Sequence, residues 1–229
     1  MRPRALGSRQ RRGRAAPHRA RVCRQRFGGP AGFTMRLAAS FVASAEELSS
    51  CPRWERTEVA LAGRSNVGKS SLLNAIAANG RLARTSRTPG RTRALNFFAL
   101  GQCLALVDLP GFGYAKMARD RAQALSRLLS DYLEGRANLA ALLLLVDLRR
   151  GPERDEAELV RLARRRGLRL MIAATKADKL SSNEQRRALE GFTVLSAEVM
   201  PCSARTGSGI QELRRWILGF GGPGISQAI

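Results

Sequence analysis

The feature of this sequence that most constrains its fold is the run GRSNVGKS at residues 63–70, directly after the apolar segment EVALA. The run fits GxxxxGK[ST], the phosphate-binding P-loop pattern. Its glycines let the backbone curl so that successive N–H groups point at phosphates. The lysine bridges the β- and γ-phosphates, and the serine hydroxyl coordinates Mg²⁺. The predicted phosphate-binding residues are Gly63, Arg64, Ser65, Asn66, Val67, Gly68, Lys69 and Ser70.

Apolar runs alternate with amphipathic stretches from about Thr57 onward. Strands are predicted at 58–62, 94–100, 103–107, 139–146 and 168–174. Helices are predicted directly after the P-loop and at 116–134, 153–166 and 210–220, where apolar residues recur with a helical period. This alternation predicts an α/β fold of three layers, with a mainly parallel sheet and helices on both faces.

A second motif, Asp108-Leu109-Pro110-Gly111, follows the predicted strand CLALV. An aspartate at the end of a strand beside the P-loop strand can hold the Mg²⁺ hydration shell opposite the P-loop serine. A glycine three residues later can present its N–H to the γ-phosphate. The motif therefore predicts a γ-phosphate sensor.

Two further motifs predict recognition of guanine. TKAD at 175–178 follows the strand RLMIAA, and its aspartate would accept hydrogen bonds from guanine N1–H and the exocyclic amine, with the lysine over the purine ring. Adenine offers neither donor, so a buried carboxylate would be left unpaired and ATP rejected. SAR at 203–205 would direct backbone N–H groups at guanine O6. The predicted base-binding residues are Thr175, Lys176, Ala177, Asp178, Ser203, Ala204 and Arg205.

The segment RTSRTPGRTR at 84–93 is polar and contains glycine and proline, which favours a mobile switch. Such a switch closes a threonine on Mg²⁺ when the γ-phosphate is present. Thr85, Thr88 and Thr92 are the candidates on composition. The alternative is a solvated basic loop.

Charge and composition exclude several classes of protein. The 40 Lys and Arg against 18 Asp and Glu give a formal net charge of +22, which indicates polyanions such as nucleic acid as partners. The longest apolar run, 139–146, is too short for a membrane span. The four cysteines form no CxxC pair and His18 is the only histidine, so we expect no disulfide framework, zinc site or histidine base. The expected compartment is the cytoplasm.

Residues 1–34 contain ten arginines and no acidic residue, and predict a basic disordered extension. Three explanations remain open: an RNA-attracting arm, an organellar transit peptide, or a segment upstream of a true start at Met35. The predicted organisation is this extension, one domain at 35–220 and a short tail at 221–229.

The motifs GRSNVGKSSLLN, RTSRTPGRTR, DLPGFGYA and TKADKL, with FVASA at 41–45, resemble the EngB family of bacterial GTP-binding proteins, in the Era/EngA-like branch of P-loop GTPases. The resemblance runs from about Met35 to Phe220 and implies a three-layer P-loop GTPase domain. It implies that Thr92 is the switch threonine, that Ser70 and Thr92 bind Mg²⁺, and that Lys69 and Thr92 are catalytic. The switch residues it places on GTP are Gly90, Arg91, Thr92, Arg93 and Ala94. It also implies a monomeric Mg²⁺-dependent GTPase switch in large-ribosomal-subunit assembly, with rRNA as a partner, required for normal cell division and septation.

Phe112 stands where many GTPases carry the glutamine that orients the attacking water. We therefore expect slow intrinsic hydrolysis of GTP to GDP, with a partner or an ion supplying the missing group. Asn66 is the P-loop position at which cation-activated members of this branch hold K⁺, although an asparagine in a tight loop is also a common turn former, and the branch more often has proline where Ser65 stands. The rival interpretations are an ATPase of the same fold and a basic RNA-binding protein whose GTP site reports nucleotide levels.

Overall fold

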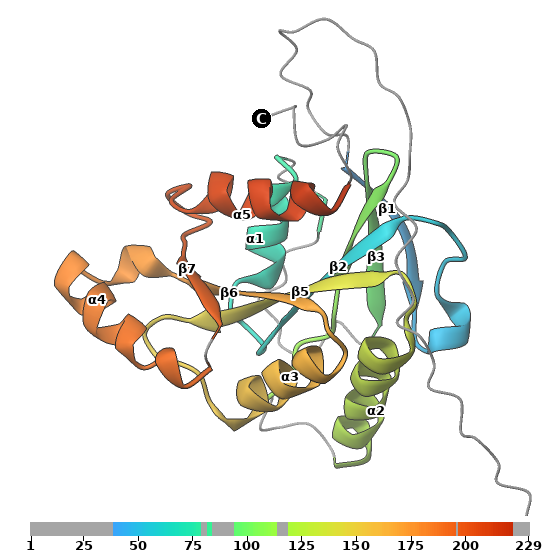
Figure 1. The fold of residues 1–229 in the computed structure, drawn as a ribbon, viewed down its shortest axis with the longest axis horizontal. Helices are drawn as coiled ribbons and strands as arrows, with labels where there is room; N and C mark the ends of the chain where they lie inside the picture. Colours follow the sequence, from blue (N-terminus) through green and yellow to red (C-terminus); the bar gives the residue numbers. More distant parts are fainter. Residues whose placement is uncertain (1–38, 79–81, 84–93, 114–118, 196, 222–229) are drawn as a thin grey trace, which may run out of the picture.

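The computed structural model describes residues 39–78, 82–83, 94–113, 119–195 and 197–221 (Figure 1). The predicted extension at 1–34 and switch at 84–93 lie outside these residues, as does all but the first residue of the predicted tail at 221–229.

One sheet organises the described residues, with strand order β1-β3-β4-β2-β5-β6-β7. Strands β2, β4, β5, β6 and β7 are parallel, whereas β3 pairs antiparallel with β4 and β1 antiparallel with β3. The strands are β1 (Ala39–Ala45), β2 (Thr57–Gly63), β3 (Leu95–Leu100), β4 (Leu104–Asp108), β5 (Leu139–Asp147), β6 (Arg169–Thr175) and β7 (Glu198–Pro201). The mainly parallel sheet is confirmed.

Helices cover both faces of the sheet. Figure 1 shows α1 and α5 on one face and α2 and α3 on the other, with α4 beyond the β7 edge. The helices are α1 (Lys69–Ile76), α2 (Arg119–Gly135), α3 (Arg154–Arg165), α4 (Ser182–Glu190) and α5 (Ile210–Leu218). In β2, Val59 and Leu61 pack in the core under α1 and α5, while Ala60 packs with α2 and α3. Both faces of the strand are buried, as in three-layer α/β folds, so the predicted architecture is confirmed.

Helix α3 begins and ends near the predicted boundaries for identifiable reasons. Glu153 is its N-cap, and the side chain of Glu156 closes a capping box on the Glu153 N–H. Acidic residues in its first turn and arginines in its last turn complement the helix dipole.

Three elements were not predicted from the sequence. Strand β1 has a mostly exposed pattern and a register shift between Phe41 and Ala43, so no regular alternation marks it. Helix α4 has no fully buried residue and is defined by a capping box between Ser181 and Glu184. Strand β7 is only four residues long. In the described part of the chain, no helix is both long enough and apolar enough to cross a membrane.

Candidate nucleotide-binding site

The predicted motifs meet at one end of the sheet because β2, β4 and β6 are parallel and each ends at a motif. Strand β2 ends at Gly63 and α1 begins at Lys69, so the P-loop spans the strand-to-helix turn. A Cβ at Gly63 would lie 2.9 Å from Leu145 O, which no larger residue could accommodate without displacing β5. Gly68 has a φ of 105° and Asn66 a φ of 64°. The positive φ accounts for an asparagine at position 66.

The P-loop lysine contacts the aspartate at the end of β4. Lys69 Nζ donates a hydrogen bond to Asp108 Oδ1, and the two form a buried ion pair, with residue exposures of 9% and 3%. The lysine that would neutralise phosphate charge and the carboxylate on the metal side of the site are therefore direct neighbours.

The segment after Asp108 packs on the P-loop. Leu109 N–H donates to Leu61 O, and Ser65 N–H donates to Phe112 O, both at 3.0 Å. A Cβ at Gly111 would lie 3.0 Å from Ser65 Oγ and 3.2 Å from Ser65 N. The close approach favours glycine at 111 and places the predicted γ-phosphate sensor against the phosphate loop.

Arg64 joins the P-loop to α3. Its Nη1 donates to Glu153 Oε2 at 2.6 Å and lies 3.9 Å from Glu156 Oε2. Burial raises the pKa of the Glu156 carboxyl group. A Cβ at Gly113 would lie 2.7–2.8 Å from the Arg64 guanidinium, so that glycine allows the guanidinium to cross the backbone. The Arg64 side chain is thus engaged by α3 and by the segment after Gly111, and its predicted phosphate contact rests on the backbone N–H.

The two guanine motifs come together across β6 and β7. Ser203 Oγ donates to Asp178 Oδ1 at 2.6 Å, and Arg205 Nε donates to Asp178 Oδ2 at 2.8 Å. These two hydrogen bonds, from Ser203 first and then Arg205, lower the pKa of Asp178, which stays ionised at neutral pH. Burial raises the pKa of the neighbouring Cys202 thiol to about 12, so it is no nucleophile at neutral pH.

Lys176 is held between the P-loop and β5. Its backbone has a φ of 61°, and its Nζ donates to Asn66 O at 2.8 Å and lies 3.0 Å from Asp147 Oδ2. Thr175 Oγ1 donates to Val67 O at 2.8 Å, a second link between TKAD and the P-loop.

Sequence reasoning missed Asp147 and Arg149 as site residues. Arg149 donates to both Asp147 oxygens, Nε at 2.9 Å and Nη2 at 2.7 Å. Burial raises the pKa of Asp147, but hydrogen bonds from Arg149 and Lys176 outweigh burial, and the net pKa lies well below the usual range. The available signal was an aspartate directly after an apolar strand, the same pattern that marked Asp108.

We expect Asp147→Asn to weaken GDP binding about tenfold. The change removes the ionic partner of Lys176 and one charge-assisted hydrogen bond, worth about 1.5 kcal/mol. Titration with a fluorescent GDP analogue measures the effect, with Asp131→Asn, the same substitution at an exposed position of α2, as the control. Equal affinities in wild type and Asp147→Asn would contradict a positioning role for this carboxylate.

The residues fit Mg²⁺ bound together with phosphates. Asp108 lies at the end of β4, and Ser70 lies in the first turn of α1. Both side chains offer the oxygen ligands that Mg²⁺ prefers. Among the described residues, no group of three or more His, Cys, Asp or Glu could hold a metal alone, so the remaining ligands would come from the nucleotide and water. Of the predicted switch contacts, Gly90, Arg91, Thr92 and Arg93 lie outside the described residues, and Ala94 directly precedes β3.

Comparison with known proteins places the chain in a family. A family model described as 50S ribosome-binding GTPase matches residues 58–176. The chain is 39% identical over 202 residues to the probable GTP-binding protein EngB of Cereibacter sphaeroides, covering 85% of this chain and 89% of that protein. It is 44% identical over 194 residues to the same-named protein of Nitrosococcus oceani, covering 80% and 96%.

Solved structures share the fold. A crystal structure of a probable GTP-binding protein EngB matches with a TM-score of 0.57 and 24% identity, covering 71% of this chain and 97% of that one. An Era variant from Aquifex aeolicus matches with a TM-score of 0.57 and 21% identity, covering 71% and 56%. With the motifs assembled at the carboxyl end of the sheet, the chain belongs to the EngB family of GTP-binding proteins and is a P-loop GTPase.

Proposed function

We propose that this GTPase is a Mg²⁺-dependent switch that binds the large ribosomal subunit in one nucleotide state during its assembly, and that normal cell division and septation depend on this role. The observation that carries the proposal is the packing of the segment at 109–113 on the P-loop residues Arg64 and Ser65. Loss of the γ-phosphate would remove a contact that this segment makes through Gly111, and α2 follows this segment in the chain. The printed description of the family model supports the ribosome as the partner.

The proposal assigns a role to each of the predicted residues. Lys69 neutralises charge on the β- and γ-phosphates, and Gly111 presents its N–H to the γ-phosphate. Ser70 and Thr92 would hold Mg²⁺, which would supply positive charge to neutralise the phosphates. Asp178 reads guanine, with Ser203–Arg205 beside it, and the whole predicted set of nucleotide-binding residues is proposed to act here. Single-turnover GTP hydrolysis, measured with and without purified large subunits, tests the proposal. The proposal would be overturned if large subunits neither raise nor lower the rate of GTP hydrolysis and the protein does not bind to them.

We expect ribosome binding to be electrostatic and dependent on the bound nucleotide. Residues 81–93 carry five arginines and no acidic residue. Of this stretch, only residues 82–83 are among those that the structure describes. Contacts between arginines and rRNA phosphates release counterions, so affinity falls steeply as salt rises. Co-sedimentation with large subunits at increasing KCl, with GDP and with a non-hydrolysable GTP analogue, measures both properties. A flat salt response or equal binding in both states would contradict the expectation.

We also propose that K⁺ activates hydrolysis by contacting Asn66 and the phosphates, in place of the glutamine that Phe112 replaces. K⁺ has a larger radius and a looser hydration shell than Na⁺, so we expect faster turnover in K⁺ at constant ionic strength. The φ of 64° at Asn66 would also account for an asparagine at this position without a bound cation. The variant Asn66→Gly distinguishes the two explanations, because glycine adopts the same backbone conformation and lacks the side-chain amide. Equal rates of the wild type in the two salts, or full K⁺ activation in Asn66→Gly, would rule the cation site out.

A further inference from the structure

A cluster of exposed arginines lies at the end of α3 and the start of β6. The α3 arginine patch consists of Arg161, Arg164, Arg165, Arg166 and Arg169, all exposed. Residues 161–169 thus hold five arginines and no acidic residue. No other nine-residue stretch of the described ranges contains five basic residues without an acidic one.

Among the described residues, Arg165 and Arg169 carry the uncompensated positive charge of the patch. Arg164 Nη2 donates to Leu195 O, and Arg166 Nε donates to Leu133 O at 3.1 Å. These two acceptors are neutral carbonyls, which help to hold the guanidinium groups in place. Arg165 and Arg169 form no ion pair with a described carboxylate, and the ion pair of Arg161 with Glu158 is long, at 3.9 Å.

Arg169 lies too far from the nucleotide motifs to serve the phosphates, whereas Arg161 and Arg165 line a pocket that Arg64 and Phe112 also line. Arg169 is the first residue of β6 and Thr175 the last. Six residue steps along a strand separate their Cα atoms by about 20 Å. This exceeds the Debye length of about 8 Å at physiological ionic strength, so the two ends are electrostatically independent in water.

We propose that the α3 arginine patch is a docking surface for the phosphate backbone of RNA, and that it binds in both nucleotide states. The inference rests on the proposed ribosomal role and adds a second point of contact, around Arg169 at the opposite end of β6 from Thr175. Arginine guanidinium groups pair with phosphate oxygens through two parallel hydrogen bonds. Because backbone carbonyls already order two of these side chains, binding costs them less conformational entropy than free arginines would lose.

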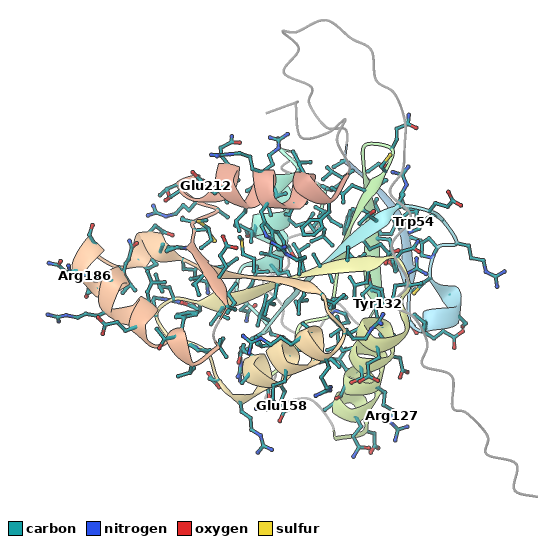
Figure 2. The ribbon with its side chains drawn as sticks, in the orientation of Figure 1. Trp54, Arg127, Tyr132, Glu158, Arg186 and Glu212 are labelled. Atoms are coloured by element: carbon teal, nitrogen blue, oxygen red, sulfur yellow. The ribbon has the colours of Figure 1, made fainter. Side chains whose placement is uncertain are left out.

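Arg165→Gln/Arg169→Gln in the full chain tests the patch, with Arg186→Gln/Arg187→Gln as the matched control. The control removes the same charge from exposed arginines near the end of another helix, α4, where Arg186 is labelled in Figure 2. The probes are purified large ribosomal subunits and a fluorescently labelled 20-base-pair RNA duplex, each with GDP and with a non-hydrolysable GTP analogue. Thermal unfolding and GDP affinity, both expected unchanged, verify that the variants are folded.

We expect the patch variant to bind both probes about tenfold more weakly in both nucleotide states, and the slope of log affinity against log salt to become shallower by about 1.5. Wild-type affinity in the patch variant, an equal loss in the control, or a loss in one nucleotide state only would overturn the inference. Transfer of the effect to vesicles of phosphatidylglycerol, with none on RNA, would overturn it in favour of a membrane surface.

The two probes separate this inference from the proposed function. Loss of duplex binding in the patch variant, with no wild-type binding to large subunits, would support an RNA surface and overturn the ribosomal role. Wild-type binding to large subunits that the patch variant retains would support the ribosomal role and overturn the patch.

Discussion

Asp178→Asn is expected to weaken GTP binding by roughly 100-fold and to shift preference toward xanthosine triphosphate. Two charge-assisted hydrogen bonds from guanine would be lost or weakened, at a cost of about 3 kcal/mol. Xanthine carries a carbonyl in place of the exocyclic amine and can accept from the asparagine amide. Ser203 and Arg205 each donate a hydrogen bond to one oxygen of the Asp178 carboxylate. The substitution also removes the negative charge with which Arg205 pairs.

Competition of GTP, ATP and xanthosine triphosphate against a bound fluorescent GDP analogue measures this change of specificity. Asp131→Asn, an exposed aspartate on α2, is the control. If Asp178→Asn keeps wild-type GTP affinity, the assignment of TKAD to the guanine base is wrong.

The largest expected loss of stability is at the other end of β2. Glu58 is fully buried and accepts hydrogen bonds from Trp54 Nε1 at 2.6 Å, Tyr132 Oη at 2.8 Å and Arg136 Nη2 at 2.5 Å. Trp54 and Tyr132 are labelled in Figure 2. Burial, together with the nearby Glu58 charge, raises the pKa of Tyr132, which remains a neutral donor. The network ties α2 to the P-loop strand.

Arg136→Ala is expected to lower the free energy of unfolding by about 3–5 kcal/mol, because it leaves the Glu58 carboxylate buried without its cation. This is a large part of the about 5–15 kcal/mol typical of a domain. Urea unfolding measures the loss, with Arg127→Ala on the exposed side of α2 as the control.

The double variant Glu58→Gln/Arg136→Ala is expected to recover part of that stability. The amide oxygen of the introduced glutamine still accepts from Trp54 Nε1, its NH2 group can donate to the Tyr132 hydroxyl, and no uncompensated charge is left. A double variant less stable than Arg136→Ala would show that the carboxylate does not carry the penalty.

The parts of the fold that were predictable are those specified by local sequence. The P-loop, DLPG and TKAD each follow an apolar run, so their strands and the end of the sheet at which they meet could be predicted from the motifs alone. Helix α3 could be placed because its acidic start and basic end are local signals. The edge strand β1 could not, because its pairing with β3 joins residues about 55 positions apart and its exposed faces carry no period.

The site was predictable to the same degree. Lys69, Asp108 and Asp178 stand in motifs whose chemistry depends on residue type and spacing. Glu58 gave no such signal inside the run EVALA, because its partners Trp54, Tyr132 and Arg136 come together only through tertiary packing. Arg64 is a motif residue whose partner, Glu153, lies 89 positions away, so its link to α3 could not be read from the motif.

The buried pair of Lys69 and Asp108 has a consequence for the order in which ligands load. While Lys69 pairs with Asp108, the carboxylate that would face Mg²⁺ is matched by an ammonium group and presents little net negative charge to a divalent ion. Phosphates that draw Lys69 toward themselves would release Asp108 at the same moment. Metal and nucleotide would therefore bind as one complex, and the protein alone would have little affinity for Mg²⁺.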